Sequence, residues 1–168
     1  WICLLYSMDD CVMDDLTVVI PVYRENHEVL DEIVSELENL GVEVIVVDDG
    51  SSDRTASAAR ESGAKVIVQE HKGPAAARNL GAREAKGDII LFTDSDCVPE
   101  KNWMSEMAKP FNDPSIAGVQ GAYRTGQKSL MARFVQIEIE DRYERMLKQE
   151  SIDFIGTYSA GYRREVFL

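Results

Sequence analysis

The sequence predicts an α/β fold in which a mostly parallel sheet is flanked by helices on both faces. Short β-branched runs alternate with helical segments from residue 16 onward, and strict alternation of this kind is typical of βαβ units. The runs are apolar throughout, as in LTVVIPV and DIILFT. Strands without a polar side belong to sheets that are covered on both faces.

The expected elements follow one another with short connections. Strands are predicted at residues 16–22, 43–47, 65–69, 88–93 and 117–123. Helices are predicted at residues 26–40, 52–61, 74–86, 102–111 and 127–149. Asn26 can cap the first helix and Gly41 can end it, while Pro74 suits the first turn of the third. The last helix is expected to turn a set of side chains inward, namely Leu130, Phe134, Ile137, Tyr143 and Leu147.

Charge and hydropathy exclude several classes of protein. The chain has 168 residues and a formal net charge of −12, because 30 Asp and Glu outnumber 18 Lys and Arg. An acidic surface repels phosphate backbones and anionic lipids, so neither nucleic acid nor a membrane surface is an expected partner. The apolar runs are too short to cross a bilayer. Membrane contact is therefore expected only through segments absent from this chain.

Cysteine usage indicates a reducing compartment. The three cysteines, Cys3, Cys11 and Cys97, have no CxxC spacing, so neither a disulfide framework nor a structural zinc site is predicted. We expect a cytoplasmic protein, either free or, in its full-length form, on the cytoplasmic face of a membrane.

A pair of carboxylates follows the strand at residues 88–93, where Asp94 and Asp96 flank Ser95. Ligands of parallel α/β sheets bind at the carboxyl ends of the strands. A hard divalent cation is commonly held there by one or two carboxylates together with substrate phosphates. The alternative is structural, since either aspartate could cap the next helix or form an Asx-turn.

Two further segments reach the same edge of the predicted sheet. The stretch DDGSSD at 48–53 either forms a turn and caps a helix or supplies a carboxylate that accepts a hydrogen bond from the N–H of an imide-like ring. The stretch GPAAARN at 73–79 either presents a helix start and Arg78 to an anion or is an ordinary surface helix. A ring pocket, a cation site and an anion-facing helix start together describe a site for a nucleoside diphosphate.

Four segments then carry a family resemblance, in the order TVVIPVYRE, VVDDGSSDRT, GPAAARNLGAREAKGDIILFTDSD and GTYSAGYRREVF. Together they resemble the family 2 glycosyltransferases of the GT-A fold, a Rossmann-like fold, over residues 16–168. The resemblance implies transfer of a sugar from a UDP- or GDP-linked donor to a hydroxyl of a glycan, lipid or small molecule. It also implies Mn²⁺ or Mg²⁺ as cofactor and inversion at the sugar.

On the base side of the donor, the resemblance assigns roles to four residues. Pro21, Tyr23 and Glu25 would frame the base and ribose, and Asp49 would accept a hydrogen bond from the base. All four follow the first or the second predicted strand.

On the diphosphate side, Arg78 would lie near the phosphates and Ser95 would contact the nucleotide-sugar. Asp94 would contact the ribose or the metal, and Asp96 would ligate the metal. The segment 156–164 resembles the part that lines the acceptor side in relatives.

The ends of the chain complete the domain prediction. Residues 1–15 are expected to be a poorly determined leader, and residues 16–168 a GT-A domain that is incomplete at its C-terminal end. The resemblance implies a general base, an aspartate, beyond Leu168, so the chain is expected to bind nucleotide and metal but to transfer sugar poorly. The residues Glu140 and Asp141 match the acidic pair that contains the general base in this family. They lie in a predicted helix before residue 156, however, and are expected on its solvent-exposed face, so the role of general base is not assigned to them.

Four other classes of protein share parts of this pattern. In a haloacid-dehalogenase-like phosphatase, Asp94 would be the nucleophile and Asp96 the acid, but the later acidic pair of that class is missing. A receiver domain would place its lysine farther from Asp94 than Lys109. A sugar nucleotidyltransferase would have a glycine-rich loop in place of PVYRENHE. A nucleotide-binding module without transfer activity also fits the pattern.

Overall fold

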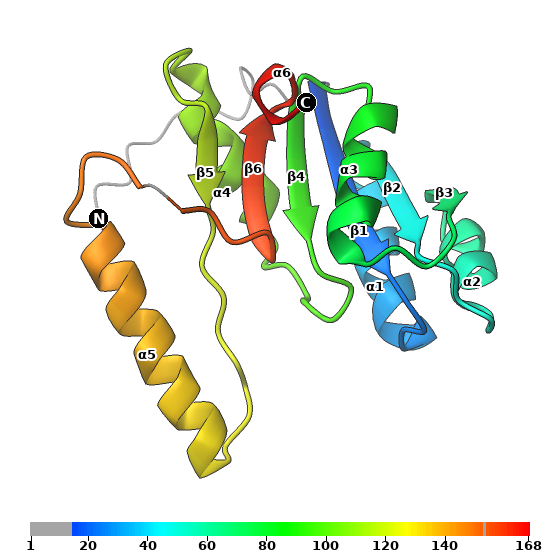
Figure 1. Cartoon of the computed structure of the whole chain (residues 1–168), viewed down its shortest axis with the longest axis horizontal. Coiled ribbons are helices and arrows are strands. Elements are labelled where there is room, and N and C mark those ends of the chain that lie inside the picture. The colour runs from blue at the N-terminus through cyan, green and yellow to red at the C-terminus, as the bar shows by residue number, and fades with distance from the viewer. Residues whose placement is uncertain (1–14, 153) are drawn as a thin grey trace.

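The computed structural model describes residues 15–152 and 154–168, and it contains a six-stranded sheet with helices on both faces (Figure 1). The strands are β1 (Leu16–Val22), β2 (Glu43–Asp48), β3 (Lys65–Val68), β4 (Ile89–Thr93), β5 (Gly118–Gln120) and β6 (Ser159–Arg163). The helices are α1 (His27–Glu38), α2 (Thr55–Glu61), α3 (Pro74–Glu84), α4 (Trp103–Ala108), α5 (Leu130–Met146) and α6 (Arg164–Phe167), with a 3₁₀ turn η3 (Lys109–Asn112) after α4. The expected leader lies outside the described residues except for Asp15, as do Cys3 and Cys11.

The sheet has the strand order β3-β2-β1-β4-β6-β5. Parallel pairs join β1 to β2, β1 to β4 and β2 to β3, whereas β6 runs antiparallel to both β4 and β5. The predicted mostly parallel α/β sheet is therefore confirmed. The carboxyl ends of all four parallel strands meet at one edge, the lower edge in Figure 1.

Two cores lie on opposite faces of the sheet because side chains alternate along each strand. On one face, Val18 and Ile20 of β1 pack with buried side chains of α1 and α4, such as Leu30 and Met104. On the other face, Val19 packs in the cluster that includes the buried alanines of α3 and Phe92 of β4. Helices on both faces were predicted, and the two clusters confirm them.

The central strand β1 separates from β4 near its end. It pairs with β2 as far as Val22, but its pairing with β4 stops at Val19. The carbonyl of Val22 accepts a hydrogen bond from the Asp49 N–H on the β2 side, so the backbone of Pro21 faces β4. Because proline has no N–H to donate, a crevice opens between the ends of β1 and β4.

Strand β6 was not predicted from the sequence. Its residues, SAGYR, contain neither a β-branched residue nor a long apolar run, so strand propensity gives little signal. Backbone pairing with β4 and β5 supplies the stabilisation instead. A Cβ added at Gly161 would lie 2.9 Å from both Leu91 and Val119, so a side chain there would collide with both neighbouring strands.

The inward face predicted for the last helix is wrong for α5. No described residue of this helix is buried, and Leu130, Phe134, Ile137 and Leu147 are 59–85% exposed. Tyr143 alone of the five predicted side chains is not among the exposed set, and it contacts Tyr158. Within residues 15–152 and 154–168, no helix is long and apolar enough to cross a membrane.

We predict that Gly81→Ala destabilises the domain by about 1–3 kcal/mol, the usual cost of overpacking a core. A Cβ at this position would lie 2.3 Å from Cγ1 of Val19 and 3.1 Å from Cγ2 of Val47, both β-branched core side chains. The penalty should outweigh the gain in helix propensity of about 1 kcal/mol. Urea unfolding measures the change, and Gly126→Ala is the control, because a Cβ at Gly126 meets no atom within 4 Å. A variant as stable as the parent would show that α3 can move away from β1.

Candidate functional site

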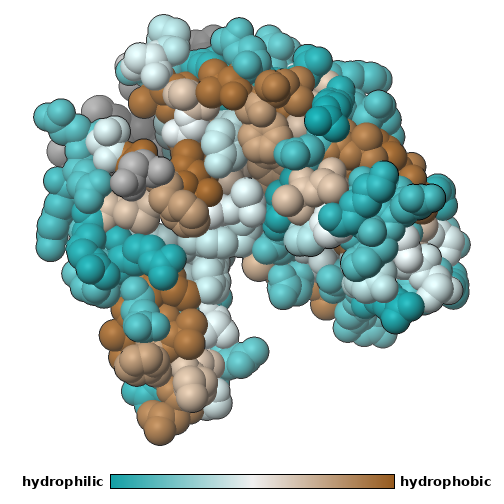
Figure 2. All heavy atoms as spheres, in the orientation of Figure 1, coloured by the Kyte–Doolittle hydropathy of each residue, from teal (hydrophilic) through white to brown (hydrophobic). Residues whose placement is uncertain are grey.

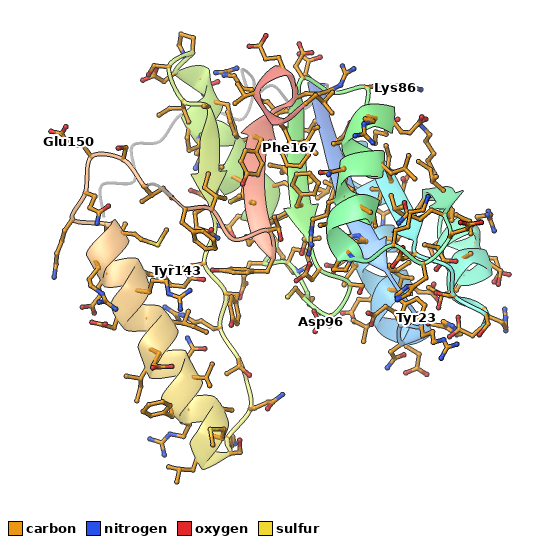
Figure 3. The ribbon with its side chains drawn as sticks, viewed as in Figure 1. Tyr23, Lys86, Asp96, Tyr143, Glu150 and Phe167 are labelled. Atoms are coloured by element: carbon orange, nitrogen blue, oxygen red, sulfur yellow. The ribbon has the colours of Figure 1, made fainter. Side chains whose placement is uncertain are left out.

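A cavity of about 340 Å³ lies at the carboxyl edge of the parallel strands, where the crevice between β1 and β4 opens. Figure 3 shows Tyr23 and Asp96 at this same lower edge of the sheet. The lining residues are Pro21, Val22, Tyr23, Glu25, Asp49, His71, Pro74, Arg78, Asp94, Ser95 and Asp96. All eight residues predicted for the nucleotide-sugar and metal sites are therefore together in one cavity, and their individual roles stay predictions.

Asp49 is the most densely bonded side chain of the cavity and is 3% exposed. Its Oδ1 accepts hydrogen bonds from Gln69 Nε2 at 2.6 Å and from the Lys72 N–H at 2.8 Å. Its Oδ2 accepts from the Gly73 N–H at 2.8 Å and lies 2.8 Å from His71 Nδ1. A carboxylate has about four acceptor positions, so the loop at 69–73 fills them all.

The same contacts control the charge of Asp49. Burial by itself raises the pKa of this carboxyl, but the Lys72 N–H, the Gln69 amide and the Gly73 N–H lower it, with a smaller contribution from His71. The net result is a pKa below the ordinary value of an aspartate. Asp49 therefore stays ionised at neutral pH and anchors the loop that leads into α3.

His71 is a cavity residue that the sequence analysis left without a role. Its ring stands 4.3 Å from the ring of Tyr23, tilted by 31°. Its Nδ1 lies within hydrogen-bond distance of two acceptors, the side chain and the carbonyl of Asp49, so Nδ1 carries the proton. The position of His71 in the loop that follows β3 was the available signal, because ligands of parallel α/β sheets bind at that edge.

Arg78 faces the first carboxylate of the DSD segment. It forms an ion pair with Asp94, and only 12% of its side chain is exposed. Its Nε is buried and has no hydrogen-bond partner in the described part of the protein. A nearly buried guanidinium with an unused N–H beside the start of α3 is suited to an additional anionic oxygen.

The oxygen-rich pair Asp94 and Asp96 suits a hard divalent cation. Among the described residues, no group of three or more His, Cys, Asp or Glu could hold a metal ion by itself. Mg²⁺ and similar cations are commonly bound by one or two carboxylates with phosphate oxygens and waters completing the shell. The residues therefore fit a cation that arrives together with a diphosphate.

Cys97 is a free thiol beside the second carboxylate. Burial raises the pKa of this thiol to about 12, with a further contribution from the neighbouring Asp96 carboxylate. The Sγ also donates to Asp96 Oδ1 at 3.5 Å. A thiol that stays protonated is a poor nucleophile, so Cys97 is assigned a structural role.

A second, larger cavity of about 620 Å³ meets the first at Asp96. Aromatic side chains from three parts of the chain line it, and these are Trp103, Tyr123 and Tyr158. Trp103 Nε1 donates to Ser159 Oγ at 3.0 Å, and the rings of Tyr123 and Tyr158 meet edge to face at 4.9 Å. Part of the segment expected on the acceptor side, Tyr158 and Ser159, therefore lies in a cavity adjoining the carboxylate pair.

The arrangement of the sheet and its flanking helices is that of a GT-A glycosyltransferase domain. Two solved structures share the fold. A mannosyltransferase from Pyrobaculum calidifontis in complex with GDP-Man and Mn²⁺ superposes with a TM-score of 0.70 at 23% identity, over 93% of this chain and 48% of that one. Glucosyl-3-phosphoglycerate synthase from Mycobacterium tuberculosis in complex with UDP also gives a TM-score of 0.70, at 22% identity, over 98% of this chain and 64% of that one.

The chain belongs to glycosyl transferase family 2, whose sequence profile matches residues 17–168. This membership excludes the phosphatase, receiver-domain and nucleotidyltransferase alternatives. A pre-mycofactocin glycosyltransferase of Mycobacterium tuberculosis is 41% identical over 107 residues, which is 61% of this chain and 22% of that protein. An N-acetylglucosaminyltransferase of Azorhizobium caulinodans is 30% identical over 134 residues, 72% of this chain and 34% of that protein. The chain thus spans about a fifth to a third of the length of these relatives.

We predict that Asp49→Asn lowers the free energy of unfolding at pH 7 by about 2 kcal/mol or more. The N–H donors of the loop at 69–73 now bond a charged carboxylate, and the asparagine amide cannot accept from all of them. The folded pKa of Asp49 lies below its unfolded value, so its stabilisation is present above about pH 4 and is lost as the pH falls through the folded pKa. The difference between parent and variant should therefore shrink below about pH 4.

Urea unfolding at several pH values measures both effects. Glu70→Gln is the matched control, since Glu70 is an exposed carboxylate in the loop at 69–73, to which Asp49 is hydrogen-bonded. Equal stability of Asp49→Asn and the parent at pH 7 would contradict the anchoring role.

Proposed function

We propose that the protein transfers a sugar from a nucleoside diphosphate-sugar to an acceptor hydroxyl, with a divalent cation and with inversion at the sugar. The observation that carries this proposal is one cavity in which base-side residues, Arg78 and the carboxylates of Asp94 and Asp96 meet, in a chain of family 2. Relatives of similar fold are complexes with GDP-Man, UDP and Mn²⁺.

The base of the donor would occupy the slot beside Tyr23 and His71. Pro21 and Glu25 line the same side of the cavity. A base N–H can bond Asp49 only by replacing one of the four contacts of this carboxylate, and His71 is the most readily displaced, since its side chain is 60% exposed. Recognition of the base at Asp49 is therefore an exchange of hydrogen bonds.

The diphosphate would lie between the start of α3 and the DSD segment. The guanidinium of Arg78 already faces the site and has an unused N–H, so it can bond a phosphate oxygen and orient the leaving group. Asp94 and Asp96 would hold Mn²⁺ or Mg²⁺ against the same phosphates. When bound, the cation neutralises the charge that grows on the departing diphosphate.

The acceptor would enter through the second cavity. The two cavities meet at Asp96, so an acceptor in the second cavity would lie next to the donor in the first. The new bond to the hydroxyl oxygen would form as the bond to the diphosphate breaks, which inverts the configuration at that carbon. The hydroxyl proton would pass to a general base, the aspartate that the family resemblance implies. The aromatic lining, with Trp103 and Tyr158, offers flat apolar surfaces on which a sugar ring or another apolar group can pack.

A cytoplasmic location is part of this proposal. Cys97 is a free thiol, as is usual in a reducing compartment.

We predict that one of UDP and GDP binds to the chain in the presence of Mn²⁺, and that Asp96→Asn weakens this binding at least about tenfold because a charged ligand of the cation is lost. Calorimetric titration of both nucleotides, with and without Mn²⁺, gives the affinities. The control is Glu100→Gln, an exposed carboxylate that lines the second cavity but not the first.

Binding that is equally tight without Mn²⁺, or unchanged in Asp96→Asn, would refute the metal dependence. If neither nucleotide binds under any condition, the donor site itself is refuted.

A further inference from the structure

His71 brings an aromatic ring to the first cavity from the loop at 69–73, between β3 and α3. The centroid of its imidazole is 4.3 Å from that of the Tyr23 ring, and the two rings are tilted by 31°. Its Nδ1 lies 2.8 Å from Asp49 Oδ2 and 3.1 Å from the carbonyl oxygen of Asp49. The imidazole therefore makes two contacts at once, one between rings and one between a ring N–H and a carboxylate.

These two contacts are the ones that a nucleobase would make in this part of the cavity. A base packs its flat ring against aromatic side chains, and the role proposed for Asp49 is to accept a hydrogen bond from a ring N–H. A second ring does not fit between Tyr23 and His71 at 4.3 Å, because two successive ring contacts span about 9 Å or more. The imidazole thus lies in the position proposed for the base.

Arg24 also contacts the ring of Tyr23, but further hydrogen bonds hold it in place. Its guanidinium carbon is 5.2 Å from the ring centroid. Its Nη2 donates to Ser52 Oγ at 3.3 Å, and its backbone N–H donates to Ser51 Oγ at 2.9 Å. Because Arg24 is tied to the loop after β2, a base that packs on Tyr23 displaces His71 instead.

The side chain of His71 can move while its loop stays in place. The backbone N–H groups of Lys72 and Gly73 both donate to Asp49 at 2.8 Å. The side chain of His71, by contrast, is 60% exposed. Tyr23 lies at the lower right of the molecule in Figure 3, and this region is mostly teal and white in Figure 2. An imidazole that leaves the cavity there enters water beside hydrophilic side chains.

We propose that His71 is an internal competitor for the base of the donor and thereby sets the affinity of the site for nucleotides. This inference rests on the proposed function, since it takes the first cavity as the donor site. A nucleotide displaces the imidazole and makes the same two contacts with its base, at Tyr23 and Asp49. A ligand with phosphates but no base leaves His71 where it is.

The competition also favours release of the nucleoside diphosphate after sugar transfer. The imidazole stays attached to the loop beside the site, so its effective concentration there is high. It can return to Asp49 as soon as the base loosens. Product release limits the rate of many enzymes, and a competing side chain shortens the time that the product stays bound.

Calorimetric titration of UDP, GDP and inorganic pyrophosphate, each with Mn²⁺, against the parent and His71→Ala tests the proposal. The nucleotide that binds the parent should bind the variant at least about threefold more tightly, because its base no longer replaces an intramolecular hydrogen bond. Pyrophosphate has no base and should bind both proteins equally. Glu70→Gln, at an exposed residue of the same loop, is the matched control and should change neither affinity.

Tyr23→Ala should have the opposite effect on nucleotide affinity. The variant lacks the ring on which the base packs, so nucleotide binding should weaken about fivefold or more. Weaker binding in His71→Ala as well would show that the imidazole is a partner of the base, and it would overturn the proposal. Unchanged nucleotide affinity in His71→Ala would overturn it too, as would a gain that pyrophosphate shares.

NMR spectroscopy follows the imidazole directly. The sequence contains two histidines, His27 and His71, and His27 does not line the first cavity. The spectrum of His71→Ala therefore assigns both rings. Nucleotide should shift the His71 ring signals and abolish their nuclear Overhauser contact with Tyr23, whereas pyrophosphate should preserve this contact. A contact that persists with bound nucleotide would contradict displacement of the imidazole.

Failure of the proposed function gives a different result from failure of this inference. If neither nucleotide binds to the parent or to His71→Ala, the donor site is refuted and the competitor role with it. If a nucleotide binds to both with the same affinity, the donor site stands and only the role of His71 is refuted.

Discussion

The parallel pairing of β1 with β2 on one side and β4 on the other is the constraint on which the rest of the structure depends. It buries alternate side chains of β1 in two separate cores and brings the ends of three strands to one edge. Because the pairing with β4 ends at Val19 while that with β2 continues, the sheet itself opens the crevice. The loops that follow β1, β2, β3 and β4, together with the first turns of α3, supply the lining of the cavity.

Much of this arrangement could be predicted from the sequence, for a physical reason. The strand pattern, the caps and the acidic segments are local features, and the rule that ligands bind at strand ends converts them into one site. All eight predicted residues meet there. Their bonding could not be predicted, because the contacts of Asp49 with Gln69 and His71 join positions about twenty residues apart. Strand β6 was missed because its stability comes from pairing with β4 and β5 and not from the strand propensity of its own residues. The predicted inward face of α5 was wrong because helical periodicity identifies an apolar face of the helix but not whether another element packs against that face.

The filled acceptor positions of Asp49 have a thermodynamic consequence. This carboxylate has exchanged water for four donors of the loop at 69–73. A base that bonded it, as proposed, would gain only the difference between a new hydrogen bond and the one that is broken, so the contact would add little to affinity. A base that presents an acceptor instead would leave a buried charge facing a lone pair, which is costly. If Asp49 receives the base as proposed, it would discriminate between nucleotides chiefly by disfavouring the wrong base.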